Sequence, residues 1–168
     1  QASIDAGIGA IMTFHGFLPA LDSSGVPATL SPHVMTTLLR EQLGFDGLLI
    51  SDAMDMAGVV DRFGAPEAAK RAIAAGNDVL LMPRDVKGTI DAVVAGLAER
   101  RYDEARIDHS VRRVLALKHH FGLQRDRLVD VERVRGVVGT DANGAVADLI
   151  AERAIVLARD SASLVPLL

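Results

Sequence analysis

The architecture of this chain is indicated most clearly by residues 45–52, Phe45-Asp46-Gly47-Leu48-Leu49-Ile50-Ser51-Asp52. Its short apolar run stops abruptly at Ser-Asp, which predicts a buried strand over residues 47–52 with a carboxylate at its carboxyl end. In α/β folds, ligands bind at that end of the strands. An ionised group beside apolar strands costs free energy unless it is paired, hydrogen-bonded or used, so Asp52 is the first candidate for a functional residue.

Strand-like and helix-like segments alternate on both sides of this stretch. Apolar runs predict two further strands, over residues 9–15 and 78–83. Helical spacing and terminal residues predict helices over residues 32–43, 66–75, 86–100 and 103–121. The first of these has Ser31 as its expected N-cap and Gly44 as its stop. Because each predicted strand is followed by a helical segment, we expect an α/β fold with parallel strands and helices outside.

The tail of the chain has a different character. Residues 124–130 are charged and are interpreted as linker, and Thr140 or Asp141 caps a predicted helix that runs to Arg153. Residues 154–160 then predict one more strand. The Arg-rich segments, Arg112-Arg113 among them, are interpreted as solvated faces, as charge runs usually are.

Composition bounds the partners and cofactors. The 168 residues carry a net charge of −4 with the signs interspersed, which argues against a nucleic-acid partner or an anionic membrane surface. No uncharged apolar stretch reaches about 18 residues, so no membrane span is expected. Cysteine is absent, and no metal-binding or phosphate-binding motif occurs, so we predict neither a metal nor a cofactor. Residues 1–7 show no targeting signal, which leaves cytoplasm and secretion to the cell envelope both open.

Several runs together resemble a known enzyme family. They are AIMTFH at 10–15, LPALD at 18–22, PATLS at 27–31, LGFDGLLISDAMDM at 43–56 and AGNDVLLMP at 75–83. In combination they resemble glycoside hydrolase family 3. Within that family, SDAMDM at 51–56 is most similar to the bacterial β-N-acetylhexosaminidases.

The resemblance implies a fold that three strands do not complete. Three βα units cannot close a barrel of eight, and an open sheet would leave bare edges. One interpretation is that the three strands form a small open sheet. The missing initiator Met and the unfinished ends favour the other interpretation, in which this chain is part of a larger protein. We therefore expect residues 1–123 to be the C-terminal half of a catalytic (β/α)8 TIM-type barrel. Residues 124–140 would be a linker, and residues 141–168 the start of a following α/β sandwich domain.

The resemblance also assigns roles to individual residues. It implies that Asp52 is the catalytic nucleophile of a retaining glycosidase, in which one carboxylate attacks the anomeric carbon. The alternative for Asp52 is a helix N-cap. Asp55 is the nearest rival and is interpreted as structural. His15 is expected to bind a sugar hydroxyl, or else to be a satisfied core histidine, and Met54 to line the substrate pocket or pack in the core.

One part of the family pattern is missing. The acid/base Asp-His pair of this branch and its Lys-His-Phe-Pro-Gly-His motif lie upstream of the nucleophile and do not occur here; residues 118–122, KHHFG, lie downstream and do not replace them. We expect the parent to release terminal N-acetylglucosamine from peptidoglycan fragments or chitin oligomers, and this chain alone to be inactive without the N-terminal half of the barrel. The alternatives are β-glucosidase-like hydrolysis, phosphorolysis, or a truncated non-catalytic module.

Overall fold

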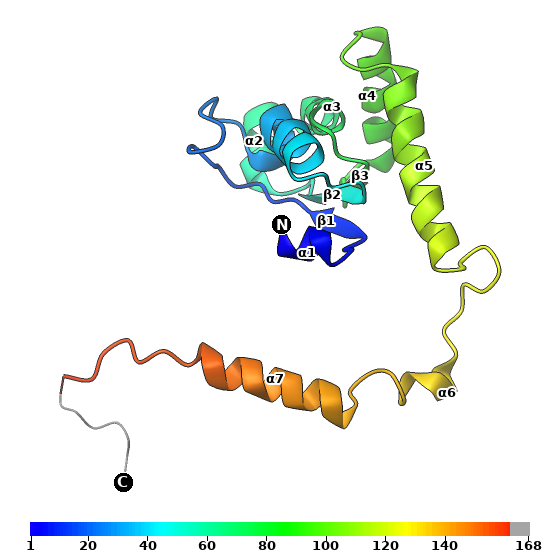
Figure 1. Ribbon diagram of the computed structural model, residues 1–168. Helices are drawn as coiled ribbons and strands as arrows, with labels where there is room; N and C mark the ends of the chain where they lie inside the picture. Colours follow the sequence, from blue (N-terminus) through cyan, green and yellow to red (C-terminus); the bar gives the residue numbers. More distant parts are fainter. Residues whose placement is uncertain (162–168) are drawn as a thin grey trace. The chain divides into compact units, whose positions relative to one another are not determined.

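The computed structural model describes residues 1–161, and the chain divides into two compact units, Gln1–Gln124 and Arg125–Leu168. The first unit contains the sheet and every residue predicted to act on substrate. Strands β1 (Ala10–Met12), β2 (Leu48–Ala53) and β3 (Val79–Leu81) form a parallel sheet in the order β1-β2-β3 (Figure 1). The three predicted strands are confirmed, with β1 and β3 shorter than expected.

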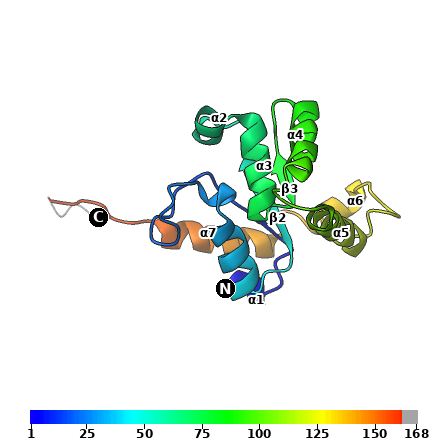
Figure 2. The ribbon, with the colours of Figure 1, turned by 90° about the horizontal axis from the view of Figure 1, so that it is seen from above.

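The helices of the first unit alternate with these strands, as the sequence predicted. They are α1 (Ala2–Asp5), the 3-10 turn η1 (Ala28–Leu30), the π-helix η2 (His33–Gln42), α2 (Ala57–Phe63), α3 (Ala65–Ala75), α4 (Val86–Ala98) and α5 (Glu104–His120). Helices α3 and α4 lie side by side (Figures 1 and 2). The sequence did not predict α2 or the π form of η2.

Local signals account for the bounds of η2. The Ser31 hydroxyl accepts a hydrogen bond from the Val34 amide at 3.1 Å, which confirms Ser31 as the N-cap. Gly44, just past the helix, has a φ of 67°, a left-handed conformation that glycine adopts without steric cost. The expected start and stop of this helix are therefore both present.

The core lies between the sheet and the helices on one of its faces. One cluster joins Leu49 of β2 to Met35, Phe45 and Ala75, with Ile11 packed against it. A second cluster is formed around α2 and α3 by Leu30, Met54, Val59, Ala68 and Ala72. Burial of these side chains is what attaches η2, α2 and α3 to the sheet.

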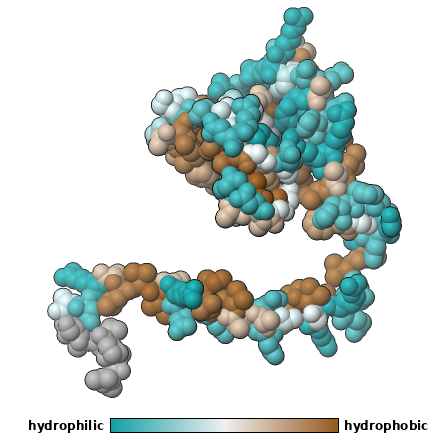
Figure 3. All heavy atoms as spheres, in the orientation of Figure 1, coloured by the Kyte–Doolittle hydropathy of each residue, from teal (hydrophilic) through white to brown (hydrophobic). Residues whose placement is uncertain are grey.

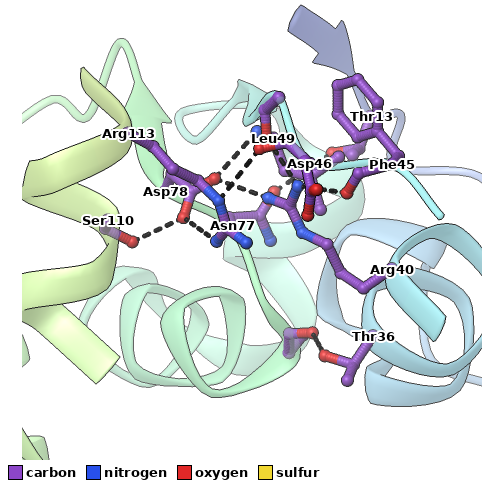
Figure 4. Close-up of polar contacts among 12 residues, drawn as sticks. Thr13, Thr36, Arg40, Phe45, Asp46, Leu49, Asn77, Asp78, Ser110 and Arg113 are labelled. Atoms are coloured by element: carbon purple, nitrogen blue, oxygen red, sulfur yellow. Dashed lines mark hydrogen bonds and ion pairs between the residues drawn. The ribbon is translucent and has the colours of Figure 1, made fainter. Parts of the chain in front are cut away.

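A buried ionic cluster stabilises the amino-terminal ends of the strands (Figure 4). The Asp78 side chain is 0% exposed and lies 2.7 Å from Arg40, 3.3 Å from Arg113 and 3.5 Å from Arg106. It also accepts hydrogen bonds from the Ser110 hydroxyl at 2.6 Å and the Leu49 amide at 3.1 Å. Burial lowers the pKa of Arg40 from its ordinary value, because desolvation disfavours its charged form.

This cluster corrects the interpretation of Arg112-Arg113 as a solvated face. The Arg113 side chain is only 20% exposed and also donates to the Asp46 carbonyl at 3.2 Å, whereas Arg112 is 73% exposed. A buried carboxylate requires compensating charge, and Arg106 and Arg113 bring that charge from α5. The cluster therefore attaches α5 to the sheet.

The second unit is helical in its described part. It contains α6 (Val131–Val134), inside the expected linker, and α7 (Asp141–Ala154). The Thr140 hydroxyl accepts from the Asn143 amide at 3.3 Å, which confirms the predicted cap. The strand predicted over residues 154–160 is absent: Ala154 ends α7, and residues 155–160 adopt no regular structure.

A physical reason for the missing strand is the lack of a partner. A strand requires neighbouring backbone groups for its hydrogen bonds, and residues 125–161 contain no other strand. Ile155 and Val156 are 81% and 80% exposed, and Figure 3 shows hydrophobic residues, in brown, along much of this unit. Residues 162–168, the end of the expected second domain, lie outside the described residues.

Among residues 1–161, no helix is long and apolar enough to cross a membrane.

Candidate active site

Asp52 lies at the carboxyl end of β2, the central strand of the sheet. Its side chain is partly exposed, and Oδ1 accepts a hydrogen bond from the Ala53 amide at 2.8 Å. The carboxylate is thus held by the backbone and still has access to solvent, as a nucleophile needs.

His15 reaches the same end of the sheet from the segment after β1. Its Nε2 lies 2.9 Å from the carbonyl oxygen of Ala53, and its Nδ1 lies 3.1 Å from the hydroxyl of Thr29. A carbonyl oxygen only accepts hydrogen bonds, so Nε2 carries a proton. His15 therefore joins the end of β1 to the residue that follows Asp52.

A buried polar network holds the segment that carries His15. Asn77 is 0% exposed and donates to the Thr29 carbonyl at 2.8 Å and the Ala72 carbonyl at 2.9 Å. The hydroxyls of Thr13 and Thr29 lie 3.0 Å apart, and Thr29 donates to the Phe14 carbonyl at 2.9 Å. Because buried polar groups are held by their hydrogen bonds, this network fixes the segment on which His15 sits.

Sequence reasoning singled out none of these supporting residues. A signal was present for Thr13, a polar residue within an apolar run, and for Asn77, between a helix stop and a strand. Neither position reveals a partner, because Thr13 and Asn77 are 64 residues apart in the chain.

The residues that follow Asp52 separate into core and surface. Met54 is 4% exposed and packs in the cluster with Leu30 and Val59, which matches the core role that was the alternative to a pocket wall. Met56 is 45% exposed. Asp55 is partly buried and lies in the turn between β2 and α2.

The loop between β1 and η2 has its own anchor at Asp22. Its carboxylate accepts a hydrogen bond from the Ser24 amide at 2.8 Å and another from the Ser31 hydroxyl. Hydrogen bonds from Ser24 and Ser31 lower the pKa of Asp22 to about 2. The loop is therefore tied to the cap of η2.

Within residues 1–161, no three histidine or acidic side chains come together as metal ligands would.

A comparison with protein families identifies the family to which this chain belongs. Residues 1–117 match the model of the glycosyl hydrolase family 3 N terminal domain. The chain belongs to glycoside hydrolase family 3. The α/β class predicted from the sequence agrees with this family and its solved structures.

Relatives within glycoside hydrolase family 3 are several times longer than this chain. A β-N-acetylglucosaminidase/β-glucosidase of Cellulomonas fimi is 30% identical over 99% of the chain and 31% of its own length. A β-hexosaminidase of Chromobacterium violaceum is 43% identical over 56% of the chain and 26% of its own length. The chain thus spans less than a third of these family members.

Solved structures of the family show the same arrangement. A β-N-acetylglucosaminidase from a Paenibacillus species superposes with a TM-score of 0.74 at 34% identity, over 90% of this chain and 29% of its own. The β-glucoside phosphorylase BglX superposes with a TM-score of 0.78 at 26% identity, over 99% of this chain and 32% of its own. Solved proteins with different named activities therefore resemble this chain in structure.

Proposed function

We propose that this chain is the later part of the catalytic domain of a retaining exo-glycosidase that releases terminal β-linked N-acetylhexosamine, with Asp52 as its nucleophile. The observation that carries the proposal is the position of Asp52, a partly exposed carboxylate held by a backbone amide at the carboxyl end of the central parallel strand. The names of the relatives, mostly hexosaminidases and N-acetylglucosaminidases, support the substrate class.

In the proposed reaction, a carboxylate oxygen of Asp52 bonds to C1 of the sugar while the bond from C1 to the leaving-group oxygen breaks. An acid protonates that oxygen, and the sugar remains attached as a glycosyl ester. Water, deprotonated by the same group acting as a base, then attacks C1 and restores the Asp52 carboxylate. Retention follows because the two displacements each invert C1.

The acid/base group is proposed to lie in chain outside residues 1–168. An uncovered apolar groove and one exposed apolar side chain on the opposite edge strand support a barrel that continues beyond this segment. On α4, Val86, Ile90 and Val94 are 61%, 57% and 59% exposed, and they line a groove of about 410 Å³ beside β3. On the other edge strand, Met12 is 58% exposed. Further βα units packed at these edges would bury both surfaces and pair the bare strands.

His15 and Met54 are still proposed to lie near the substrate, but their contacts within the protein limit how either side chain could touch it. Both ring nitrogens of His15 already have protein partners, so a sugar hydroxyl would have to replace Thr29 or Ala53. Met54 would have to leave the core to touch a sugar. We therefore propose that His15 acts mainly by positioning the backbone after Asp52.

A second candidate is a β-glucosidase-like hydrolase or a phosphorylase, favoured by the structural similarity to BglX. In phosphorolysis, phosphate replaces water as the attacking group. Product analysis with and without phosphate separates the two, because only a phosphorylase forms a sugar 1-phosphate. The third hypothesis is that the chain is a non-catalytic module, because it spans less than a third of the length of these relatives.

The decisive experiment traps the glycosyl ester in the complete protein that contains this chain. A fluorinated N-acetylglucosaminyl donor forms the ester but hydrolyses slowly, and peptide mass analysis locates the added mass. We expect it on the peptide that holds Asp52, and Asp52→Asn lowers kcat by roughly 10⁴-fold or more, the scale seen when other hydrolases lose a nucleophile. Asp55→Asn is the matched control. Label on Asp55, or normal activity of Asp52→Asn, would overturn the assignment.

A further inference from the structure

Phe14, an exposed aromatic residue just after β1, has no part in the proposed mechanism. We propose that Phe14 forms the wall of the sugar site next to Asp52 and selects for the N-acetyl group at C2 of the sugar. This inference rests on the proposed function, because it concerns the sugar that would be bonded to Asp52. Its evidence is the register of the sheet, the exposure of Phe14 and the contact of its ring with Gly16.

The register places Phe14 level with Asp52. Strands β1 and β2 pair Met12 with Ile50, and the Thr13 amide donates to the Ile50 carbonyl at 2.8 Å, which continues the pairing. Phe14 follows Thr13 and lies two positions after Met12. Asp52 likewise lies two positions after Ile50, the partner of Met12. Continued by two residues past Met12, this register would set Phe14 opposite Asp52, about 4.8 Å away, which is the spacing of neighbouring strands.

Strand alternation places both side chains on the same face of the sheet. Leu49 and Ser51 are 0% exposed, and Ile11 packs against the Leu49 cluster on the helix side, as Thr13 packs against Thr29. The alternate residues therefore project from the opposite face. On that face Met12 is 58% and Phe14 49% exposed, and Asp52 is partly exposed.

Gly16 provides the space that holds the Phe14 ring. A Cβ atom at Gly16 would lie 2.0 Å from Cε2 of Phe14 and 2.5 Å from Cδ2, far inside contact distance. The ring therefore rests directly on the Gly16 backbone. Since Gly16 is not among the glycines with positive φ, it is needed here for space rather than for its backbone conformation.

The chemistry of the neighbouring position suggests what the ring recognises. Carbohydrate-binding pockets, like other ligand sites, combine a few polar groups with apolar and aromatic walls. C2 is bonded to C1, the atom that Asp52 would attack, so the C2 substituent comes within reach of a group beside Asp52. An exposed ring there offers an apolar surface to the methyl of an N-acetyl group, which a hydroxyl at C2 does not use.

The test measures selectivity in the complete enzyme. We expect Phe14→Ala to lower kcat/KM for an aryl N-acetylglucosaminide by about 10- to 100-fold, the range for loss of a small apolar contact, with a smaller change for the aryl glucoside. Phe17→Ala is the matched control, because Phe17 is 51% exposed in the same loop but lies under Arg62 at 5.8 Å. It should leave the ratio of the two kcat/KM values unchanged.

Gly16→Ala provides an independent check on the position of the ring. The added methyl must displace Phe14, so the same loss of selectivity is expected. In the Phe14→Ala background the methyl has nothing to displace, and Gly16→Ala should then have no further effect. Thermal unfolding of each variant verifies that it is folded.

The outcomes separate this inference from the proposed function. If Phe14→Ala leaves the ratio of the two kcat/KM values unchanged, the proposed role of Phe14 is overturned. The proposed function still stands in that case, provided that Asp52→Asn abolishes activity. Normal activity of Asp52→Asn overturns the proposed function itself. An additive loss in the double variant contradicts the contact between Phe14 and Gly16.

Discussion

Nε2 of His15 lies 2.9 Å from the carbonyl oxygen of Ala53, and this bond joins the ends of β1 and β2 one residue past Asp52. Through Thr29, the same imidazole is connected to the buried Asn77. The backbone that presents the Asp52 carboxylate is therefore fixed from the neighbouring strand. A small shift of a reacting group has a large effect on rate, so this support has a measurable consequence.

We expect His15→Ala to lower kcat/KM of the complete enzyme by about 10- to 100-fold, because misplacing a reacting group by about 1 Å costs on that scale. His33→Ala is the control, since His33 is exposed. In the wild type, nitrogen NMR of His15 should show a proton on Nε2. An unchanged kcat/KM in His15→Ala would show that the Ala53 contact has no catalytic consequence.

Asp78 should be a major determinant of stability. Asp78→Ala leaves three arginines near one another without their buried carboxylate, and breaking a buried ion pair costs about 3–5 kcal/mol in the free energy of unfolding. Urea unfolding of the 168-residue chain measures the loss. Asp91→Ala is the control: Asp91 pairs with Lys87 at 62% and 86% side-chain exposure, where ion pairs contribute little. Equal effects of the two substitutions would contradict the cluster's role.

The loop anchored by Asp22 should weaken in acid. The pKa of Asp22 falls from an ordinary 3.8 to about 2 in the folded chain, because Ser24 and Ser31 donate hydrogen bonds to its ionised form. A carboxylate with a lowered folded pKa contributes stability above its unfolded pKa and loses that contribution as pH falls through the folded value. The contribution should therefore be complete above about pH 4 and disappear toward pH 2.

Carbon NMR of the Asp22 carboxyl group tests this directly, with an expected midpoint near 2. Asp22→Asn should remove the corresponding pH dependence of unfolding. A midpoint near the ordinary 3.8 would mean that the Ser24 and Ser31 bonds do not persist in solution.

The 168-residue chain by itself should show negligible turnover of an aryl N-acetylglucosaminide. The proposed proton donor, which contributes roughly 10²–10⁴-fold, and the proposed groups that position the sugar lie outside residues 1–168. Adding a polypeptide that carries the upstream half of the barrel should restore activity, while the same polypeptide mixed with the Asp52→Asn chain should not. Near-normal rates from the isolated chain would refute the assignment of the acid/base group to another segment.

Local patterns in the sequence were enough for much of the fold. Apolar runs bounded by glycine and polar residues predicted β1, β2 and β3, and the Ser31 cap is confirmed by its 3.1 Å bond to Val34. The position of Asp52 at a strand end was likewise predicted. These features depend on residues a few positions apart, so the sequence displays them directly.

Contacts between distant residues were decided only by the tertiary structure. Arg113 and Asp78 are 35 residues apart and His15 and Ala53 are 38 apart, and no local pattern marks either pair. The same limit explains the wrong strand over residues 154–160: its apolar residues suited a strand, but a strand exists only where another can bond to it. Local sequence patterns thus sufficed for the three strands, for most of the longer helices and for the carboxylate that ends β2. Tertiary structure alone decided which side chains meet there, because that depends on which faces pack together.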